Sequence, residues 1–182
     1  MNKIVISLML TLASNIQATV QECDVIWIGK QSYLTPVYPL ESCTDYNSGD
    51  KVFYARSSGN TRDYVAIWEV AEKKLFLVFI GRDGTSTEFL YNRDSITSEK
   101  SKRYVAHRWA TVEGLFPKRV KEGKVLADWF SGTIFSPGNA WNKTLSPEEH
   151  KKLEARATLV ITVKKGFVTN IEHREKQAPT SR

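Results

Sequence analysis

Apolar and polar residues along this chain alternate or form short apolar runs, a pattern typical of β-strands rather than of long helices. The densest apolar run covers residues 124–135, where apolar side chains fall on both faces of an extended chain. This run predicts a strand that is covered on both faces and that ends at the Pro-Gly-Asn sequence of residues 137–139. Asp128 interrupts the run, and Gly132 leaves room for a bend or for the approach of another backbone.

Two further pairs of segments are rich in β-branched and aromatic residues and predict β-hairpins. Ala-Glu-Lys-Lys joins the first pair and Lys-Lys-Gly joins the second, in which Leu159, Ile161 and Val163 share one face. The predicted strands are residues 24–29, 51–56, 64–70, 75–80, 85–91, 124–135, 158–163 and 167–174.

Only two segments predict helices, and both are short. The first predicted helix covers residues 104–112, and Gly-Leu-Phe-Pro at 114–117 breaks it. The second begins after Ser146, a capping residue, with Pro147 in its first turn and Glu149 at the capping-box spacing, and ends near residue 155. The sequence therefore predicts a mainly β fold, α+β at most. The expected architecture is an antiparallel sheet, as a partial barrel or a sandwich, with one or two short helices.

The first residues have the pattern of a secretory signal peptide. Lys3 precedes an apolar stretch at 4–13, and Ala18 offers a small residue for cleavage. The apolar stretch is too short for a membrane span, which needs about 20 residues. We therefore expect a signal at 1–18, a single β-rich domain at 19–175, a frayed tail at 176–182, and a periplasmic or secreted location.

The two cysteines, Cys23 and Cys43, predict a disulfide bond, because thiols this close in sequence normally pair in an oxidising compartment. Closing a loop of about twenty residues would stabilise the fold by ~3 kcal/mol. A catalytic thiol is less favoured because no family-type cysteine signature surrounds either cysteine. A zinc site is less favoured because His107, His150 and His173 lack ligand spacing. No metal or cofactor is expected.

The formal charge of the chain is +6, and its excess is concentrated in one segment. Residues 93–124 hold nine basic residues against four acidic ones. The electrostatic field of these basic residues could steer the chain toward an acidic protein or an anionic membrane surface. A nucleic-acid partner is not expected, because no nucleic-acid-binding module is present. A solvated loop is an equally open interpretation. The candidate partner-binding residues are Lys100, Lys102, Arg103, Tyr104, Arg108 and Trp109.

No catalytic constellation is convincing in this sequence. Asp128, Ser131 and His107 could be drawn as a triad, but no spacing brings them together. Asp128 has two interpretations: a buried carboxylate paired with an arginine, which is favoured, or one that lines a ligand cavity beside Trp129 with a raised pKa. We therefore expect no catalytic residues.

Two segments carry a resemblance to other proteins. Ala-Ile-Trp-Glu-Val-Ala-Glu-Lys-Lys-Leu-Phe-Leu at 66–77 and Ala-Asp-Trp-Phe-Ser-Gly-Thr-Ile at 127–134 resemble a loose group of small bacterial proteins of unknown function. Some members of that group accompany contact-dependent or Rhs-type toxins. The resemblance implies a binding role, so the expected function is an immunity-type protein that neutralises an acidic protein partner. A β-barrel carrier of a small molecule and a hydrolase using Asp128 are the alternatives.

Overall fold

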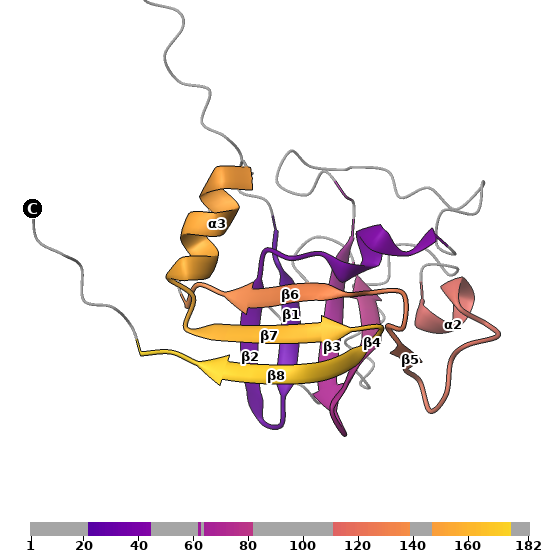
Figure 1. Cartoon of the computed structure of the whole chain (residues 1–182). Helices are drawn as coiled ribbons and strands as arrows, with labels where there is room; N and C mark the ends of the chain where they lie inside the picture. Colours follow the sequence, from indigo (N-terminus) through magenta and orange to yellow (C-terminus); the bar gives the residue numbers. More distant parts are fainter. Residues whose placement is uncertain (1–21, 45–61, 63, 82–110, 139–146, 176–182) are drawn as a thin grey trace, which may run out of the picture.

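Figure 1 shows the computed structural model of the chain, which describes residues 22–44, 62, 64–81, 111–138 and 147–175. Its strands are β1 (Asp24–Ile28), β2 (Gln31–Thr35), β3 (Val65–Ala71), β4 (Lys74–Gly81), β5 (Val125–Leu126), β6 (Gly132–Ser136), β7 (Leu159–Lys164) and β8 (Phe167–His173). Its helices are the 3-10 turn η1 (Pro39–Ser42), α2 (Val112–Leu115) and α3 (Pro147–Ala155).

The strands form one sheet in the order β2-β1-β3-β4-β8-β7-β6, and β5 pairs with β4 beside this path. All neighbours are antiparallel except β1 and β3, which are parallel. In Figure 1, β6, β7 and β8 run across β1 to β4, and the two groups join at the single pair Lys74 and Phe167. The outer strands β2 and β6 also come close to each other, so the sheet is a nearly closed barrel. The prediction of a mainly β, antiparallel-rich fold is confirmed, and the barrel is the alternative that the structure adopts.

The hairpin predicted at 64–80 is confirmed as β3 and β4, and its sequence explains its shape. The turn consists of Glu72 and Lys73, both with positive φ, as a two-residue hairpin turn with the strand twist requires. Side chains then alternate along β4, with Leu75 and Leu77 fully buried and Lys74 and Phe76 only partly buried. One face of β4 therefore belongs to the core, and the other is available for a site.

The barrel interior is filled by one large apolar cluster, to which β3, β4, β6 and β7 all contribute. The face predicted for the last hairpin is confirmed, because Leu159, Ile161 and Val163 all lie in this cluster. β1 and β3 are buried on both faces: Ile26 packs into the main cluster, while Val25 packs into a second one.

The prediction of one continuous strand at 124–135 is wrong. β5 ends at Leu126, a tight turn follows in which the Phe130 N–H donates to the Ala127 carbonyl at 2.9 Å, and β6 begins at Gly132. The Gly166 N–H then donates to the Phe130 carbonyl at 3.0 Å. The apolar residues at both odd and even positions belong to two short strands and to a turn that buries Ala127 and Phe130. A side-chain period of two cannot distinguish this arrangement from one strand covered on both faces.

The segment after β1 also differs from the prediction. We expected a disulfide-tied loop, but it forms β2, which pairs with β1 along five positions, and then η1. Cys23 and Cys43 are buried, and no disulfide joins them, so that prediction is wrong. The fold of β2 and η1 sets their separation: Cys43 lies in the main apolar cluster, which Cys23 does not reach.

The helix predicted from Pro147 is confirmed as α3. The segment at 114–117 that was expected to break the first helix contains the end of α2, which runs through Gly114 and stops at Leu115. The Thr111 side chain accepts a hydrogen bond from the Gly114 N–H at 3.0 Å. This cap offsets the unfavourable glycine. The signal, the tail, the strands at 51–56 and 85–91 and the rest of the helix at 104–112 lie outside the described residues.

Candidate functional site

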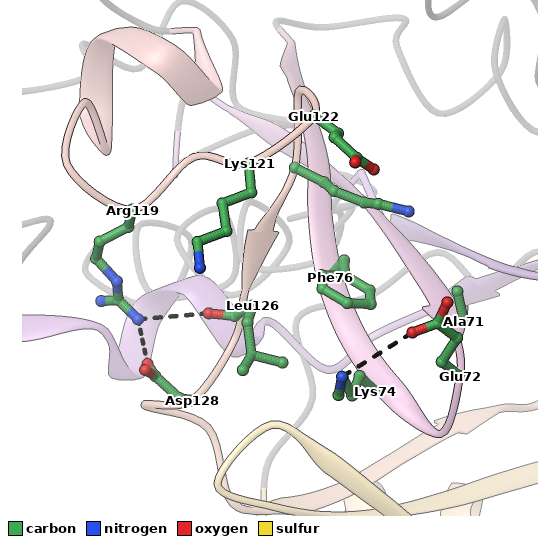
Figure 2. Close-up of a pocket in the computed structure, with 10 residues that line it drawn as sticks. Ala71, Glu72, Lys74, Phe76, Arg119, Lys121, Glu122, Leu126 and Asp128 are labelled. Carbon is green, nitrogen blue, oxygen red and sulfur yellow. Dashed lines mark hydrogen bonds and ion pairs between the residues drawn. The ribbon is translucent and has the colours of Figure 1, made fainter.

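A groove of about 510 Å³ lies on the outer face of β4 and β5, between two hairpin turns (Figure 2). One turn is Glu72-Lys73, between β3 and β4, and the other is Glu122-Gly123. This volume falls within the range of small-ligand pockets, ~300–1,000 Å³. The lining residues are Ala71, Glu72, Lys74, Phe76, Arg119, Lys121, Glu122, Lys124, Leu126 and Asp128.

Strand register explains why these side chains meet. Phe76 pairs with Leu126, so their side chains lie side by side on the outer face, while Leu77 and Val125 pair on the inner face and are fully buried. Glu69 pairs with Phe76 from the other side. Phe76 and Leu126 therefore form an apolar floor that is bordered by charged groups.

A tight hairpin places two lysines at the border of this floor. The Lys121 N–H donates to the Lys124 carbonyl at 2.9 Å, and the Lys124 N–H donates to the Lys121 carbonyl at 3.0 Å. Glu122 and Gly123 between them have positive φ. Residues that pair directly in an antiparallel hairpin project their side chains to the same face, and like charges there repel each other. The hairpin thus holds two ammonium groups on one side.

Three of the four basic groups in the groove already have acidic partners. Arg119 pairs with Asp128 and also donates to the Leu126 carbonyl at 3.4 Å. The Lys124 Nζ lies 3.6 Å from Glu69, and the Lys74 Nζ lies 4.0 Å from Glu72. These three basic groups are therefore paired with acidic side chains in the groove or beside it.

Lys121 differs from these three. Across the described part of the chain, it takes part in none of the ion pairs. Figure 2 shows its side chain between Arg119 and Leu126, with the ammonium directed toward Leu126. Lys121 is therefore the cation of the groove that remains available for an external anion.

The turn between β7 and β8 extends this positive charge beyond the groove. The Leu75 N–H donates to the Gly166 carbonyl at 2.8 Å, and the Val168 N–H donates to the Lys73 carbonyl at 2.9 Å, so this turn lies against the β3–β4 hairpin. We call the combined region the hairpin-tip surface. It contains seven basic residues, Lys73, Lys74, Arg119, Lys121, Lys124, Lys164 and Lys165, against four acidic ones, Glu69, Glu72, Glu122 and Asp128.

The structure places the predicted site residues in different environments. Asp128 has an arginine partner, as favoured, but its expected burial is wrong: its side chain is 55% exposed, at the edge of the outer groove. Trp129 lies outside the groove, stacks on Phe116 with 5.4 Å between ring centroids and donates from Nε1 to the Pro39 carbonyl at 2.9 Å. The groove that Asp128 lines therefore does not include Trp129. The candidates Lys100, Lys102, Arg103, Tyr104, Arg108 and Trp109 lie outside the described residues.

Sequence reasoning missed the buried acid of this fold, Asp24. Its side chain is fully buried and accepts hydrogen bonds from the Arg62 guanidinium, the Ala66 N–H and the Trp68 Nε1–H at 2.9–3.1 Å. Burial raises the pKa of the Asp24 carboxyl, and the charge of Arg62 opposes that shift. Arg62 itself lies over the Tyr38 ring, 3.4 Å from its centroid. An aspartate at the start of an otherwise apolar strand was the available signal.

Arg119 and Lys121 belong to the basic segment 93–124 that the sequence singled out, whereas Lys74 and Phe76 were not anticipated. In the described ranges, no cluster of three or more metal-ligating side chains is found, and no helix has the length and apolar character of a membrane span. Comparison of the chain with protein-family models, curated proteins and solved structures gives no match.

Proposed function

We propose that this chain is an exported binding protein that neutralises an acidic protein partner, an immunity-type role. The observation that carries the proposal is the hairpin-tip surface, where seven basic residues outnumber four acidic ones around a groove with an apolar floor. Complementary charge speeds encounter with a protein partner, and an apolar floor adds contact area once the two have met. The export signal expected at 1–18 would bring the chain to such a partner outside the cytoplasm.

The rival roles receive less support. A carrier of a small molecule needs an internal cavity, but the described barrel interior is filled by side chains such as Trp68, Leu77 and Ile161, each fully buried. A hydrolase needs a reactive carboxylate, but the Asp128 carboxylate is exposed and paired with Arg119. Binding through the outer surface fits the arrangement of charges better than either.

The experiment is capture of a partner from a periplasmic extract, followed by rate measurements with the purified partner. Lys121→Glu combined with Lys124→Glu should lower the association rate at low salt about tenfold or more, because steered association depends on surface charge. Lys151→Glu combined with Lys152→Glu is the matched control: it makes the same change of charge at two exposed residues on α3, which Figure 1 shows at the opposite end of the molecule.

Inhibition of the partner's own activity by the wild-type chain would then distinguish neutralisation from mere binding. An acidic partner whose association rate falls equally in the control and the groove variant would contradict the proposal, as would a captured protein that is retained unchanged at high salt.

A further inference from the structure

We infer that the groove is a subsite for one carboxylate side chain of a partner, flanked by an aliphatic residue, with Lys121 as the anion contact. This inference rests on the proposed function and specifies what the partner presents there. The groove offers one available ammonium next to the apolar pair Phe76 and Leu126. An acidic residue beside an aliphatic one in an extended segment would satisfy both features at once.

The charges of the groove favour a carboxylate over a phosphate. Arg119, the group best shaped for bidentate contact with phosphate, is already engaged by Asp128 and the Leu126 carbonyl. The remaining cation, Lys121, is a single point charge. Glu72, Glu122 and Asp128 also line the groove and would repel a dianion about twice as strongly as a single carboxylate. A phosphate monoester is therefore disfavoured by charge, and the phosphodiester of a nucleic acid or a lipid is disfavoured because the Arg119 guanidinium is already engaged.

The hairpin fixes the position of the Lys121 backbone before any ligand arrives. Two backbone hydrogen bonds close the turn, and Glu122 adopts φ 50°, a conformation that is costly for a residue other than glycine. Lys124 is held by Glu69 and by the Phe76 ring, whose centroid lies 5.0 Å from the Lys124 Nζ. Lys124 thus packs on one side of the floor and leaves Lys121 to meet the ligand.

The floor supplies selectivity for the neighbouring residue. Phe76 and Leu126 are partly buried and face outward. An aliphatic side chain that packs on them would remove apolar surface of both partners from water, which favours binding. A peptide with glycine in place of the aliphatic residue would lose this apolar contact but keep the contact between its carboxylate and Lys121. The subsite should therefore distinguish Glu-Leu from both Gln-Leu and Glu-Gly.

The test is an NMR titration of the whole chain with end-blocked peptides that contain Glu-Leu, Gln-Leu or Glu-Gly in one glycine-serine background. The Glu-Leu peptide should shift resonances of Phe76, Lys121 and Leu126 saturably, and each analogue should bind about three- to tenfold more weakly. Lys121→Met, which keeps most of the apolar stem, should weaken Glu-Leu binding by a similar factor. Lys151→Met should leave it unchanged.

Equal binding of the Glu-Leu and Gln-Leu peptides, or an unchanged affinity in Lys121→Met, would overturn the subsite. Stronger shifts of the same residues with inorganic phosphate, a short oligonucleotide or phosphatidylglycerol vesicles would also overturn it, in favour of that ligand. A full-length acidic partner that binds Lys121→Met as tightly as the wild type would refute the subsite and leave the proposed function standing. Saturable, selective peptide binding with no acidic partner captured would instead support the subsite and refute the proposed function.

Discussion

Gly166 joins the β7–β8 turn to Leu75 of β4 and to Phe130 of the turn after β5, and its replacement by alanine should be costly. It has φ +76°, and a Cβ there would lie 2.9 Å from the Ala127 carbonyl carbon and 3.0 Å from the Asp128 nitrogen. Both are backbone atoms, which no side-chain rotation can move away. The left-handed conformation alone costs a non-glycine residue ~1–2 kcal/mol, and displacing packed backbone adds ~1–3 kcal/mol. We therefore expect Gly166→Ala to lower the free energy of unfolding by ~2–5 kcal/mol.

Gly123→Ala is the matched control for this prediction. Gly123 also occupies the second position of a two-residue turn, with φ +73°, but its added Cβ would meet nothing within 4 Å. Its cost should be the conformational part alone, ~1–2 kcal/mol. Urea denaturation, monitored by tryptophan fluorescence and fitted with a common m-value, measures the free energy of unfolding of both variants. Equal losses in the two variants would refute the reasoning, because they would show that the Ala127–Asp128 backbone yields without cost.

The other predictions concern the buried polar cluster and the thiols. Asp24→Ala should lower the free energy of unfolding by ~3–5 kcal/mol, because it leaves the buried Arg62 with only the half-exposed Glu41, 3.9 Å away, as an acidic partner. A loss no larger than that of an ordinary surface variant in denaturant titration would contradict this. The raised pKa of Asp24 means that the folded state binds more protons just above the ordinary value of 3.8. Its contribution to stability should therefore decrease as pH rises through that window, and Asp24→Asn should remove this slope from unfolding curves. Alkylation of the denatured, unreduced protein should modify both Cys23 and Cys43, and a mass that shows an intact disulfide would overturn their assignment as thiols.

The local pattern of apolar and polar residues was sufficient to predict two of the β-hairpins of this protein. The patterns of 64–80 and 158–174 specified four strands and, for β7, the inward face of Leu159, Ile161 and Val163, because a side-chain period of two is a property of the strand itself. The capping residues before Pro147 likewise placed α3. The concentration of basic residues in 93–124 pointed to part of the groove, since charge is visible in sequence without any fold.

Everything that depended on which segments meet was decided by tertiary structure. The apolar run at 124–135 became two strands and a turn, because Gly166 from a distant hairpin hydrogen-bonds to Phe130 at the point of the break. The groove needs β4 beside β5, and the role of Lys121 depends on Glu69, Glu72 and Asp128 neutralising its neighbours. The pairs Phe76–Leu126 and Glu69–Lys124 join residues far apart in the chain, and the one-dimensional pattern contains periodicity and charge but not the long-range register that brings them into contact.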